Sequence, residues 1–389
     1  MRKGWEYKKL GEVCTLISDG SHNPPKGIDH SLYRMISSQN VFDDNLQITE
    51  DNVRYITESD HLCENKRTKL QKDVVLLTIV GTIGRSCVLK GNEGCLTLQR
   101  SVAALHPSDQ IMPRYLMHCL IGNRHTLNQE AHGIAQKGIY LKQLSSLSIP
   151  LPPKSTQLAI VSELDKINEL IRLKKEQLKD FDNLAQSLFY EMFGDPVENE
   201  KGWEVKKLGE IAKSAIGLTY KPENVTEELS GTVVLRSSNI QNSILDFNDI
   251  VRVNVLVKED KMVNDGDILM CSRNGSFRLV GKVALIKGLK ERMSYGAFMT
   301  IIRSPYNPYL FEYFKTPAFR QYLITGKTTT VNQITVKMLN NLTLPLPPLS
   351  LQQLFAQRIE QIEREKSEVQ KSIQDLETLL ASRIQYWFE

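Results

Sequence analysis

The sequence predicts an α+β protein in which two globular α/β domains are separated by a pair of long antiparallel coiled-coil helices, with a pseudo-twofold internal repeat. The segment GWEYKKLGE at Gly4 recurs as GWEVKKLGE at Gly202, and SIPLPPKSTQ at Ser148 recurs as TLPLPPLSLQ at Thr343. Both recurrences are about 195 residues apart, so the chain contains the same unit twice. A long run without glycine or proline follows the second segment each time, which indicates two long helices.

The repeat also sets the domain boundaries. A chain of 389 residues has room for two ordinary domains and their connecting elements. Short β-type runs such as DVVLLTIVG and TVVLRSSNI lie between glycine, asparagine and aspartate turns, so each globular part mixes helix and strand. We therefore expect globular domains at residues 1–153 and 195–348, a first long helix at 154–194 and a second at 349–389.

An apolar seam with alternating steps of three and four residues runs along both helix segments, as in a coiled coil. Ser155 and Ser350 are the expected N-caps behind Pro-Pro pairs, and the FGDP segment at Phe193 ends the first helix. Lys174 and Lys366 interrupt the seam, and a polar seam residue can set the register of a helix pair. The apolar seam positions are Ile160, Leu164, Ile167, Ile171, Leu178, Phe181 and Leu188 in the first helix and Phe355, Ile359, Ile362, Val369, Ile373, Leu376 and Leu380 in the second.

The seam predicts that the two helices pair with each other. At about 1.5 Å per residue each helix is about 60 Å long, and a small domain cannot cover an apolar stripe of that length. The first helix leads into the second globular part, which leads back into the second helix, so the pseudo-twofold repeat makes the pair antiparallel. The alternative is that the two stripes are core faces of two unrelated helical bundles.

The composition indicates a globular, cytoplasmic protein without a membrane span. Hydrophobic residues make up 41% and charged residues 24% of the chain, and no apolar run reaches the roughly 18 residues that cross a membrane. The N-terminus MRKGWEYKKL lacks the apolar segment of a secretory signal. A net charge of +4 is too weak to indicate nucleic acid by itself. The cysteines show no C-x-x-C spacing and are expected to be reduced, mostly buried thiols: Cys14, Cys63, Cys87, Cys95, Cys119 and Cys271.

The sequence contains no motif of a catalytic or cofactor site. It has no Walker A loop, no G-x-G-x-x-G after a strand and no H-E-x-x-H. SPYNPY at Ser304 lacks the residues of an amino-methyltransferase tetrapeptide, and GTIG at Gly81 is better explained as a tight turn than as a phosphate cradle. All 7 histidines fall in the first half, so no catalytic pair with histidine is common to both repeats. We therefore expect a non-catalytic chain without its own cofactor or metal.

Polar loops in both halves have side chains that suit nucleic acid. Arginine and asparagine can make bidentate contacts to guanine and adenine edges, and the stretches CSRNGSFRLVGK and LRSSNIQN supply both. Each stretch alone is better explained as a solvated loop, but the recurrence of the set in both halves favours DNA binding. The candidate DNA-contacting residues are Lys26, Ser38, Gln39, Thr82, Arg85, Gln99, Arg100, Lys137 and Tyr140 in the first half and Lys221, Arg236, Ser237, Asn239, Arg273, Asn274, Ser276, Arg278, Lys282, Asn332 and Gln333 in the second.

Over its whole length the chain resembles the specificity subunit of Type I restriction-modification enzymes. The resemblance rests on the W-E-x-K-K-L-G-E openings at Trp5 and Trp203 and on the P-L-P-P segments that lead into each long helix. SDGSHNPP at Ser18 and SRNGSFRLVGK at Ser272 also look like variants of target-recognition-domain motifs. The duplicated arrangement is more specific than any single motif.

The resemblance implies two target-recognition domains that each read one half of a bipartite, asymmetric double-stranded DNA target. It also implies that the helices dock two methyltransferase subunits, and that motor-nuclease subunits can join. S-adenosylmethionine, ATP and Mg would be bound by those partners. Three alternatives remain: the specificity subunit of a methylase-only or differently partnered system, a self-sufficient DNA methyltransferase or nuclease, and a purely structural coiled-coil protein.

Overall fold

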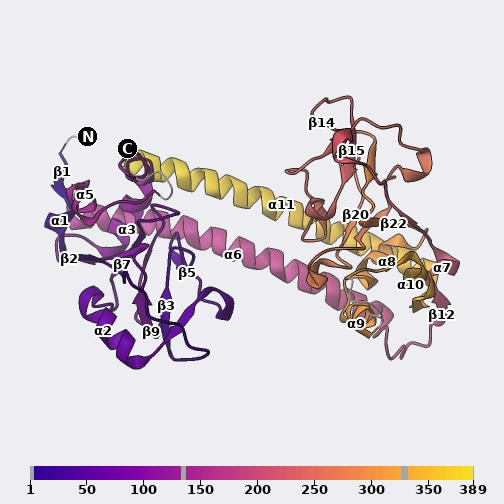
Figure 1. Ribbon diagram of the computed structural model, residues 1–389, viewed down its shortest axis with the longest axis horizontal. Coiled ribbons are helices and arrows are strands. Elements are labelled where there is room, and N and C mark those ends of the chain that lie inside the picture. Colours follow the sequence, from indigo (N-terminus) through magenta and orange to yellow (C-terminus); the bar gives the residue numbers. More distant parts are fainter. Residues whose placement is uncertain (1–3, 133–136, 326–331, 389) are drawn as a thin grey trace. The chain divides into compact units, whose positions relative to one another are not determined.

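The chain folds into two compact units, each with one globular α/β domain. We call them unit 1 (Met1–Glu176 with Gln370–Glu389) and unit 2 (Gln177–Val369). Parts of two long helices, α6 (Lys154–Phe193) and α11 (Leu349–Phe388), belong to each unit (Figure 1). This is the α+β architecture that the sequence predicts. The computed structural model describes residues 4–132, 137–325 and 332–388.

Unit 1 is built on a four-stranded antiparallel sheet of order β2-β10-β7-β8 and a three-stranded sheet of order β6-β3-β9, in which β3 and β9 are parallel. Two short pairs, β1-β11 and β4-β5, complete its strands among the described residues. The elements are β1 (Glu6–Lys9), α1 (Leu10–Val13), β2 (Cys14–Asp19), β3 (Tyr33–Ile36), β4 (Val41–Phe42), β5 (Asn45–Leu46), η1 (Glu50–Asn52), β6 (Arg54–Ile56), α2 (Glu58–Thr68), β7 (Val75–Thr78), β8 (Ser86–Val88), β9 (Cys95–Leu98), β10 (Val102–Pro107), α3 (Pro113–Gly122), α4 (Arg124–Gln129), α5 (Leu141–Ser146) and β11 (Ser148–Leu151).

Unit 2 repeats this topology. Its four-stranded sheet has the order β13-β22-β19-β20, its second sheet the order β14-β18-β15-β21, and β15 and β21 are again parallel. The elements are β12 (Glu204–Lys207), α7 (Leu208–Ile211), β13 (Lys213–Ile216), η2 (Pro222–Asn224), β14 (Val225–Thr226), β15 (Thr232–Leu235), η3 (Ser237–Asn239), β16 (Ile240–Gln241), β17 (Ile244–Leu245), β18 (Arg252–Val253), η4 (Glu259–Lys261), β19 (Ile268–Cys271), η5 (Phe277–Leu279), β20 (Val283–Leu285), β21 (Met293–Tyr295), β22 (Met299–Arg303), α8 (Asn307–Tyr313), α9 (Pro317–Thr325), α10 (Val336–Asn341) and β23 (Thr343–Leu346).

The central sheet of each unit is buried on both faces. Successive side chains of a strand point to opposite faces, and in β7 Val75 and Leu77 pack against α3 and the long helices while Leu76 packs toward the second sheet. Met270 and Leu269 of β19 divide in the same way between two cores in unit 2. A strand that is buried on both faces needs apolar residues at every position. The sequences of these strands therefore show no alternation of polar and apolar residues.

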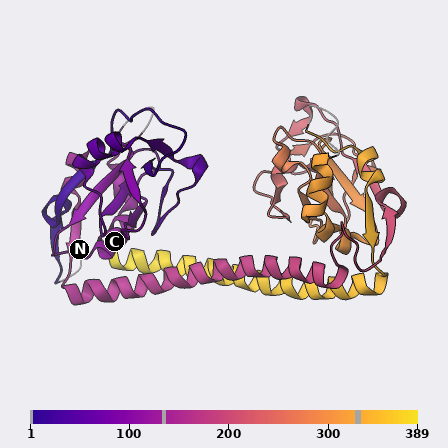
Figure 2. The same cartoon turned by 90° about the horizontal axis from the view of Figure 1, so that it is seen from below.

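The two long helices pack together in each unit, and their pairing is antiparallel. In unit 1 the start of α6 lies beside the end of α11, because Glu163 accepts hydrogen bonds from Arg383 and, at 3.0 Å, from Trp387. In unit 2 the end of α6 lies beside the start of α11, where Phe189 and Phe355 form an edge-to-face ring contact with centroids 6.0 Å apart. The stripes therefore belong to one helix pair rather than to unrelated bundles (Figure 2).

The predicted seam residues lie along this helix pair and are buried or half-buried. The buried ones are Ile160, Leu164, Ile167, Ile171, Leu188, Phe355, Ile362, Val369 and Ile373. The half-buried ones are Leu178, Phe181, Ile359, Leu376 and Leu380.

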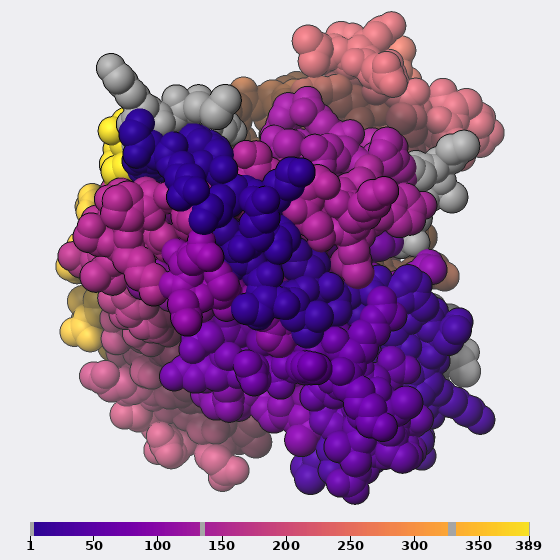
Figure 3. All heavy atoms as spheres, turned by 90° about the vertical axis from the view of Figure 1, so that its left-hand side faces the viewer, coloured from indigo at the N-terminus to yellow at the C-terminus, as the bar shows by residue number. Residues whose placement is uncertain are grey.

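Residues near the two ends of the described chain pack together against the core of unit 1. The rings of Trp5 and Trp387 stack with centroids 6.3 Å apart and an interplanar angle of 7°. Phe388 packs on Gly122 and on the ring of Tyr115, whose centroid lies 5.6 Å away. In the space-filling view of this face the N-terminal segment lies on the surface of the domain (Figure 3). The duplicated tryptophan at the start of the first repeat thus anchors the end of the second long helix.

Candidate nucleic-acid interface

Loops at the carboxyl ends of three strands meet in unit 1. Because β3 and β9 are parallel, both strands end at the same edge, where the amide of Gln99 donates to the carbonyl of Ile36 at 2.8 Å. The amide of Ser38 donates to the hydroxyl of Ser101 at 3.0 Å, and the amide of Ile79, just after β7, donates to the carbonyl of Ser101 at 2.9 Å. The structure therefore brings the predicted residues after β3, β7 and β9 into one loop cluster.

Unit 2 has the same loop cluster, with different side chains. The amide of Gly296 after β21 donates to the carbonyl of Leu235 at the end of β15 at 2.9 Å, which repeats the Gln99 contact of unit 1. The side-chain amide of Asn274 after β19 donates to the hydroxyl of Ser237 at 3.2 Å. The backbone frame is thus shared by the two units, while the groups that it presents differ.

A fourth segment joins each cluster from the end of the globular domain. In unit 1 the amide of Ile139 donates to the carbonyl of Ile79 at 2.9 Å, and in unit 2 the amide of Ile334 donates to the carbonyl of Ser272 at 2.7 Å. These contacts bring the predicted residues beside them into the clusters. They are Lys137 and Tyr140 in unit 1 and Asn332 and Gln333 in unit 2.

The unit 2 cluster presents a cation on an aromatic platform. The guanidinium of Arg273 lies 5.3 Å from the centroid of the Phe298 ring, and 58% of Phe298 is exposed. Ser276 and Arg278 are exposed on the same loop, where the amide of Ser276 donates to the side-chain oxygen of Asn274 at 3.0 Å. An exposed arginine–aromatic pair can contact a base edge, a base face or a phosphate. Sequence reasoning missed Phe298, although an aromatic residue two positions after a glycine at the end of a buried strand was a usable signal.

The structure corrects the expectation for Asn239. Only 1% of this residue is exposed, and its side-chain oxygen accepts from the amide of Arg236 at 2.8 Å while its amide donates to the carbonyls of Asp246 and Asp249. Asn40 holds the equivalent loop of unit 1 with the same pattern. Asn239 therefore shapes the loop and does not face a ligand, because all its polar atoms are used inside the fold.

Three further predicted residues of unit 2 contact other groups of the protein. The ammonium of Lys282 donates to the carbonyl of Ile240 at 2.8 Å, and burial lowers its pKa. Arg236 forms an ion pair with Asp249 at 2.8 Å and is half-buried. Lys221 is exposed in the loop after β13 and forms an ion pair with Glu223 at 3.4 Å.

In unit 1 the predicted residues around the β7–β8 turn have different degrees of exposure. Thr82 is exposed, whereas Arg85 is half-buried with its guanidinium 4.7 Å from the centroid of the Phe42 ring. Gly81 and Gly84 both have positive φ, which supports the turn interpretation of GTIG. The remaining predicted residues of unit 1 are Gln39, Arg100 and Lys26, which are exposed, and Ser38 and Gln99, which are half-buried.

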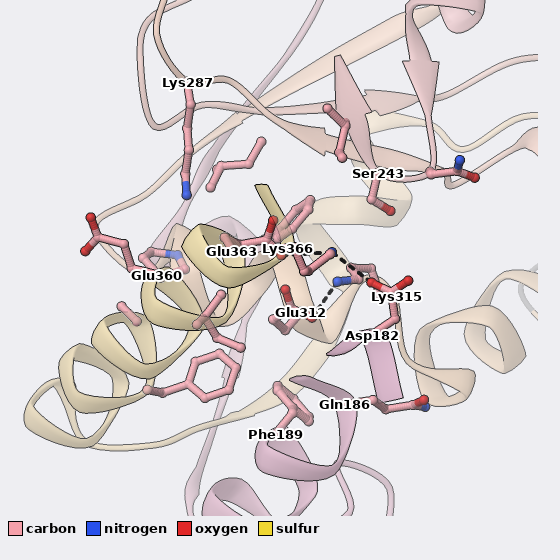
Figure 4. Close-up of a pocket in the computed structure, with 18 of the residues that line it drawn as sticks. Asp182, Gln186, Phe189, Ser243, Lys287, Glu312, Lys315, Glu360, Glu363 and Lys366 are labelled. Carbon is pink, nitrogen blue, oxygen red and sulfur yellow. Dashed lines mark hydrogen bonds and ion pairs between the residues drawn. The ribbon is translucent and has the colours of Figure 1, made fainter. Parts of the chain in front are cut away.

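Beside the helix pair, unit 2 has a cleft of about 930 Å³. It is lined by α6, α8, α11 and the β16–β17 hairpin, with Phe189 among its apolar residues and Glu312, Glu360 and Lys366 among its charged ones (Figure 4). Repeat alignment places Pro308 of this cleft at the position of Arg114 in unit 1.

In unit 1 that arginine, on α3, links the equivalent helix and hairpin. The guanidinium of Arg114 donates to Asp165 of α6 at 2.7 Å and to Asp44 of the β4–β5 hairpin at 2.9 Å, and Asp165 is 2.8 Å from the ring of the buried His118. Burial acts to raise the pKa of the Asp165 carboxyl, but the hydrogen bonds from His118 and Arg114 outweigh it and hold the pKa low. The hairpin is thus tied to α6 by ion pairs in unit 1 only, among the described residues.

The described residues include no disulfide and no cluster of metal-ligating side chains. All six cysteines are unpaired, as expected, and four are buried: Cys14, Cys87, Cys119 and Cys271. Burial raises the pKa of the Cys119 thiol to about 12, so it is a poor nucleophile. The described residues form no group of three or more side chains suited to a metal ion, and none of the described helices is both long and apolar enough to cross a membrane.

Comparison with known proteins identifies the family. The model of the Type I restriction modification DNA specificity domain matches residues 2–180 and again residues 200–378. The chain therefore belongs to this family of DNA specificity subunits, which are non-catalytic within the restriction-modification enzyme complex. The two matches coincide with the internal repeat.

Curated relatives and solved structures agree with the family. The putative type I restriction enzyme MjaX specificity subunit of Methanocaldococcus jannaschii is 24% identical over 416 residues, which cover 97% of this chain and 92% of that protein. The type I restriction enzyme EcoKI specificity subunit of Escherichia coli (strain K12) is 27% identical over 167 residues, which are 41% of this chain but only 36% of that relative.

The solved structures share the fold over nearly the whole chain. The Type-I restriction-modification system S subunit from M. genitalium has a TM-score of 0.52 at 14% identity, with 99% of this chain and 96% of that chain covered. A chain from a study of complex assembly and conformational transition of the type I R-M system has a TM-score of 0.59 at 18% identity, with 100% and 98% covered.

Proposed function

We propose that each globular domain reads one half of a bipartite double-stranded DNA target. The observation that carries this proposal is the loop cluster at the carboxyl ends of β3, β7 and β9 in unit 1 and of β15, β19 and β21 in unit 2, which has one backbone frame and two sets of side chains. A duplicated frame gives two reading surfaces, and different side chains on each give unrelated half-sites.

Within each domain, exposed and half-buried side chains would share two tasks. Arg273 and Asn274 in unit 2 and Gln99 and Arg100 in unit 1 would contact base edges, because these side chains can form paired hydrogen bonds with bases. Lys26 and Lys221, which lie in the loops after β2 and β13, would contact phosphates and position each domain.

The helix pair would dock two methyltransferase subunits. The apolar seam is buried between α6 and α11, so only the outer faces of the helices can contact partners. These faces include the exposed residues Leu184 and Leu379, which occupy the same position in the two repeats. These partners would bind S-adenosylmethionine, and motor-nuclease subunits that bind ATP and Mg can join the complex. This chain would supply specificity alone.

The test is methylome sequencing of cells that express this chain with its methyltransferase subunit. The expected result is methylated adenine within a motif that has two unrelated halves and an unread gap. Exchange of residues 272–279 for the corresponding loop of another specificity subunit is expected to change one half only. A palindromic motif, or one continuous block, would contradict the proposal.

A further inference from the structure

The loop after β2 in unit 1 is held in one conformation by contacts with the loop cluster. The amide of Gly20 donates to the carbonyl of Val102 at 3.1 Å, and the amide of Ser21 donates to the carbonyl of Leu98 at 2.8 Å. A Cβ atom on Gly20 would lie 2.2 Å from the carbonyl oxygen of Leu98, so only glycine allows this approach. This loop belongs to the SDGSHNPP segment, which the exposed Lys26 follows.

A buried carboxylate at the start of this loop holds an arginine and a histidine side chain at the surface. Asp19 has a side chain only 9% exposed, and it accepts hydrogen bonds from the guanidinium of Arg67 in the last turn of α2 and from Nε2 of His22 at 2.7 Å. The side chains of His22 and Arg67 are 55% and 50% exposed. The carboxylate therefore fixes both groups in place while leaving much of each open to solvent.

The cluster lies beside the loops that we propose read DNA. Ser21 forms a β-bridge with Gln99, and its carbonyl accepts from the amide of Arg100 at 2.9 Å. Glu64 accepts from the hydroxyl of Ser21 at 3.0 Å, and the exposed Arg100 and Lys26 lie on the loops that contain these contacts.

Unit 2 has the same turn without the histidine and the arginine. A Cβ atom on Gly217 would lie 2.1 Å from the carbonyl oxygen of Tyr295, as at Gly20, but the residue before this glycine is Ile216. Where unit 1 has α2, unit 2 has the short helix η4. The turn is thus part of the shared frame, whereas the Asp19–His22–Arg67 cluster is particular to unit 1 and is not needed to form the turn.

The hydrogen bond to Asp19 also fixes the chemistry of His22. Since Nε2 faces a carboxylate, that nitrogen carries the hydrogen, and Nδ1 is an acceptor in the neutral ring and a donor only in the imidazolium. Nδ1 makes no hydrogen bond to any residue that the structure describes. A ligand with acceptor oxygens and negative charge would therefore favour the protonated ring.

We propose that His22 and Arg67 together bind a phosphate of the DNA backbone next to the half-site of unit 1, with the His22 ring protonated in the complex. The inference rests on the proposed function, since it assumes that unit 1 contacts DNA. A phosphodiester offers two acceptor oxygens and one negative charge, and it suits the N–H donors of two side chains that are held on the same carboxylate. Asp19 acts as a positioning residue.

Salt titration tests the phosphate contact. The full chain in complex with its methyltransferase subunit is titrated with target DNA by fluorescence anisotropy across KCl concentrations. Arg67→Ala is expected to weaken binding on the order of tenfold at low salt, equally for target and altered half-sites, and to reduce the slope of log K against log salt by about 0.9. Arg67→Lys should recover the slope. Lys66→Ala is the matched control, because Lys66 is an exposed cation on the same helical turn.

A pH series tests the state of His22. Wild-type affinity is expected to fall as pH rises, because binding takes up a proton. His22→Gln should flatten this dependence, and Asp19→Asn should flatten it in part by releasing the ring. Circular dichroism of each variant confirms that the domain is folded.

Three results would overturn the inference. Unchanged affinity and slope in a folded Arg67→Ala variant would make the cluster purely structural, and altered preference at one base pair would make it a base contact. If the pH dependence of binding is unchanged in His22→Gln, the inference that the His22 ring is protonated in the complex is wrong. Each of these leaves the proposed function standing if the wild-type complex still prefers its target, whereas loss of any sequence preference in the wild type would reject the proposed function itself.

Discussion

The ammonium of Lys366 on α11 lies 2.8 Å from the carboxylate of Asp182 on α6, at the point where a lysine interrupts the apolar seam. Glu363, one turn earlier, lies 3.1 Å from the same ammonium. The polar seam position is therefore paired across the helices instead of being left without a counter-charge. A lysine can therefore occupy this seam position. Its aliphatic chain packs between the helices, while its ammonium is paired with carboxylates.

Replacing Lys366 tests this pairing. Burial acts to lower the pKa of Lys366, but Asp182 and Glu363 outweigh it and the pKa is raised. Lys366→Ala should therefore lower the free energy of unfolding by about 1 kcal/mol at neutral pH. This electrostatic loss should shrink as pH rises from the ordinary lysine pKa of about 10.4 through the higher native pKa, where the native lysine deprotonates. Urea unfolding at several pH values measures it. Lys179→Ala, an exposed lysine of α6, is the control, and an equal effect there would refute the pairing.

Asp165→Asn is expected to destabilise unit 1 by about 3 kcal/mol at neutral pH, because it leaves Arg114 and the buried His118 without their shared carboxylate. The depressed pKa of Asp165 stabilises the fold above the unfolded aspartate pKa of about 3.9, and this stabilisation is lost as pH falls through the lower, folded value. Variant and wild type should therefore converge in acid. Thermal unfolding between neutral pH and about pH 3 checks this. A similar cost for Asp180→Asn, an exposed aspartate of α6, would argue against it.

Gly217→Ala should destabilise unit 2 by about 1 to 3 kcal/mol, since the new Cβ would clash with the carbonyl oxygen of Tyr295 and the backbone must shift. Gly275→Ala is the matched control, because a Cβ there meets nothing within 4 Å and its φ is not positive. Unfolding midpoints compare the two variants. Equal stability would show that the β13 turn adapts freely to a side chain.

Asn239→Ala should cost about 2 kcal/mol of stability, because several buried hydrogen bonds are lost. Binding to DNA should weaken equally for every sequence, without a change in the half-site that is read. Competition binding against single-base variants of the target measures this. Asn248→Ala, which alters an exposed asparagine nearby, should leave both properties unchanged. A selective change at one base pair would restore Asn239 as a reading residue.

Arg273→Ala should cost about 1 to 3 kcal/mol of binding free energy, and only for DNA that carries the half-site of unit 2. Phe298→Ala should weaken the same half-site, because the guanidinium loses its aromatic platform. Competition with targets altered in one half or the other separates the effects. Lys290→Ala removes an exposed cation elsewhere in unit 2 and is the control. Uniform weakening across all sequences would mark Arg273 as a phosphate contact.

The sequence by itself determined the duplication, the two long helices and the seam along which they pair. These features depend on short-range signals: repeated segments, Pro-Pro pairs before Lys154 and Leu349, and a period of three and four residues. These features can be predicted from the sequence because helix geometry relates residues only three and four positions apart.

Only the tertiary structure decided which polar loop residues face outward. Asn239 and Asn274 both lie in polar loops after buried strands. Asn239 is buried and donates hydrogen bonds to carbonyls up to ten residues away, whereas Asn274 lies beside Ser237, near the exposed Arg273–Phe298 pair. The Asp19–Arg67 contact likewise joins β2 to the end of α2. Hydrogen bonds between segments distant in sequence leave no periodic signal, so the exposure of these side chains follows from the packing of the fold and not from the local pattern.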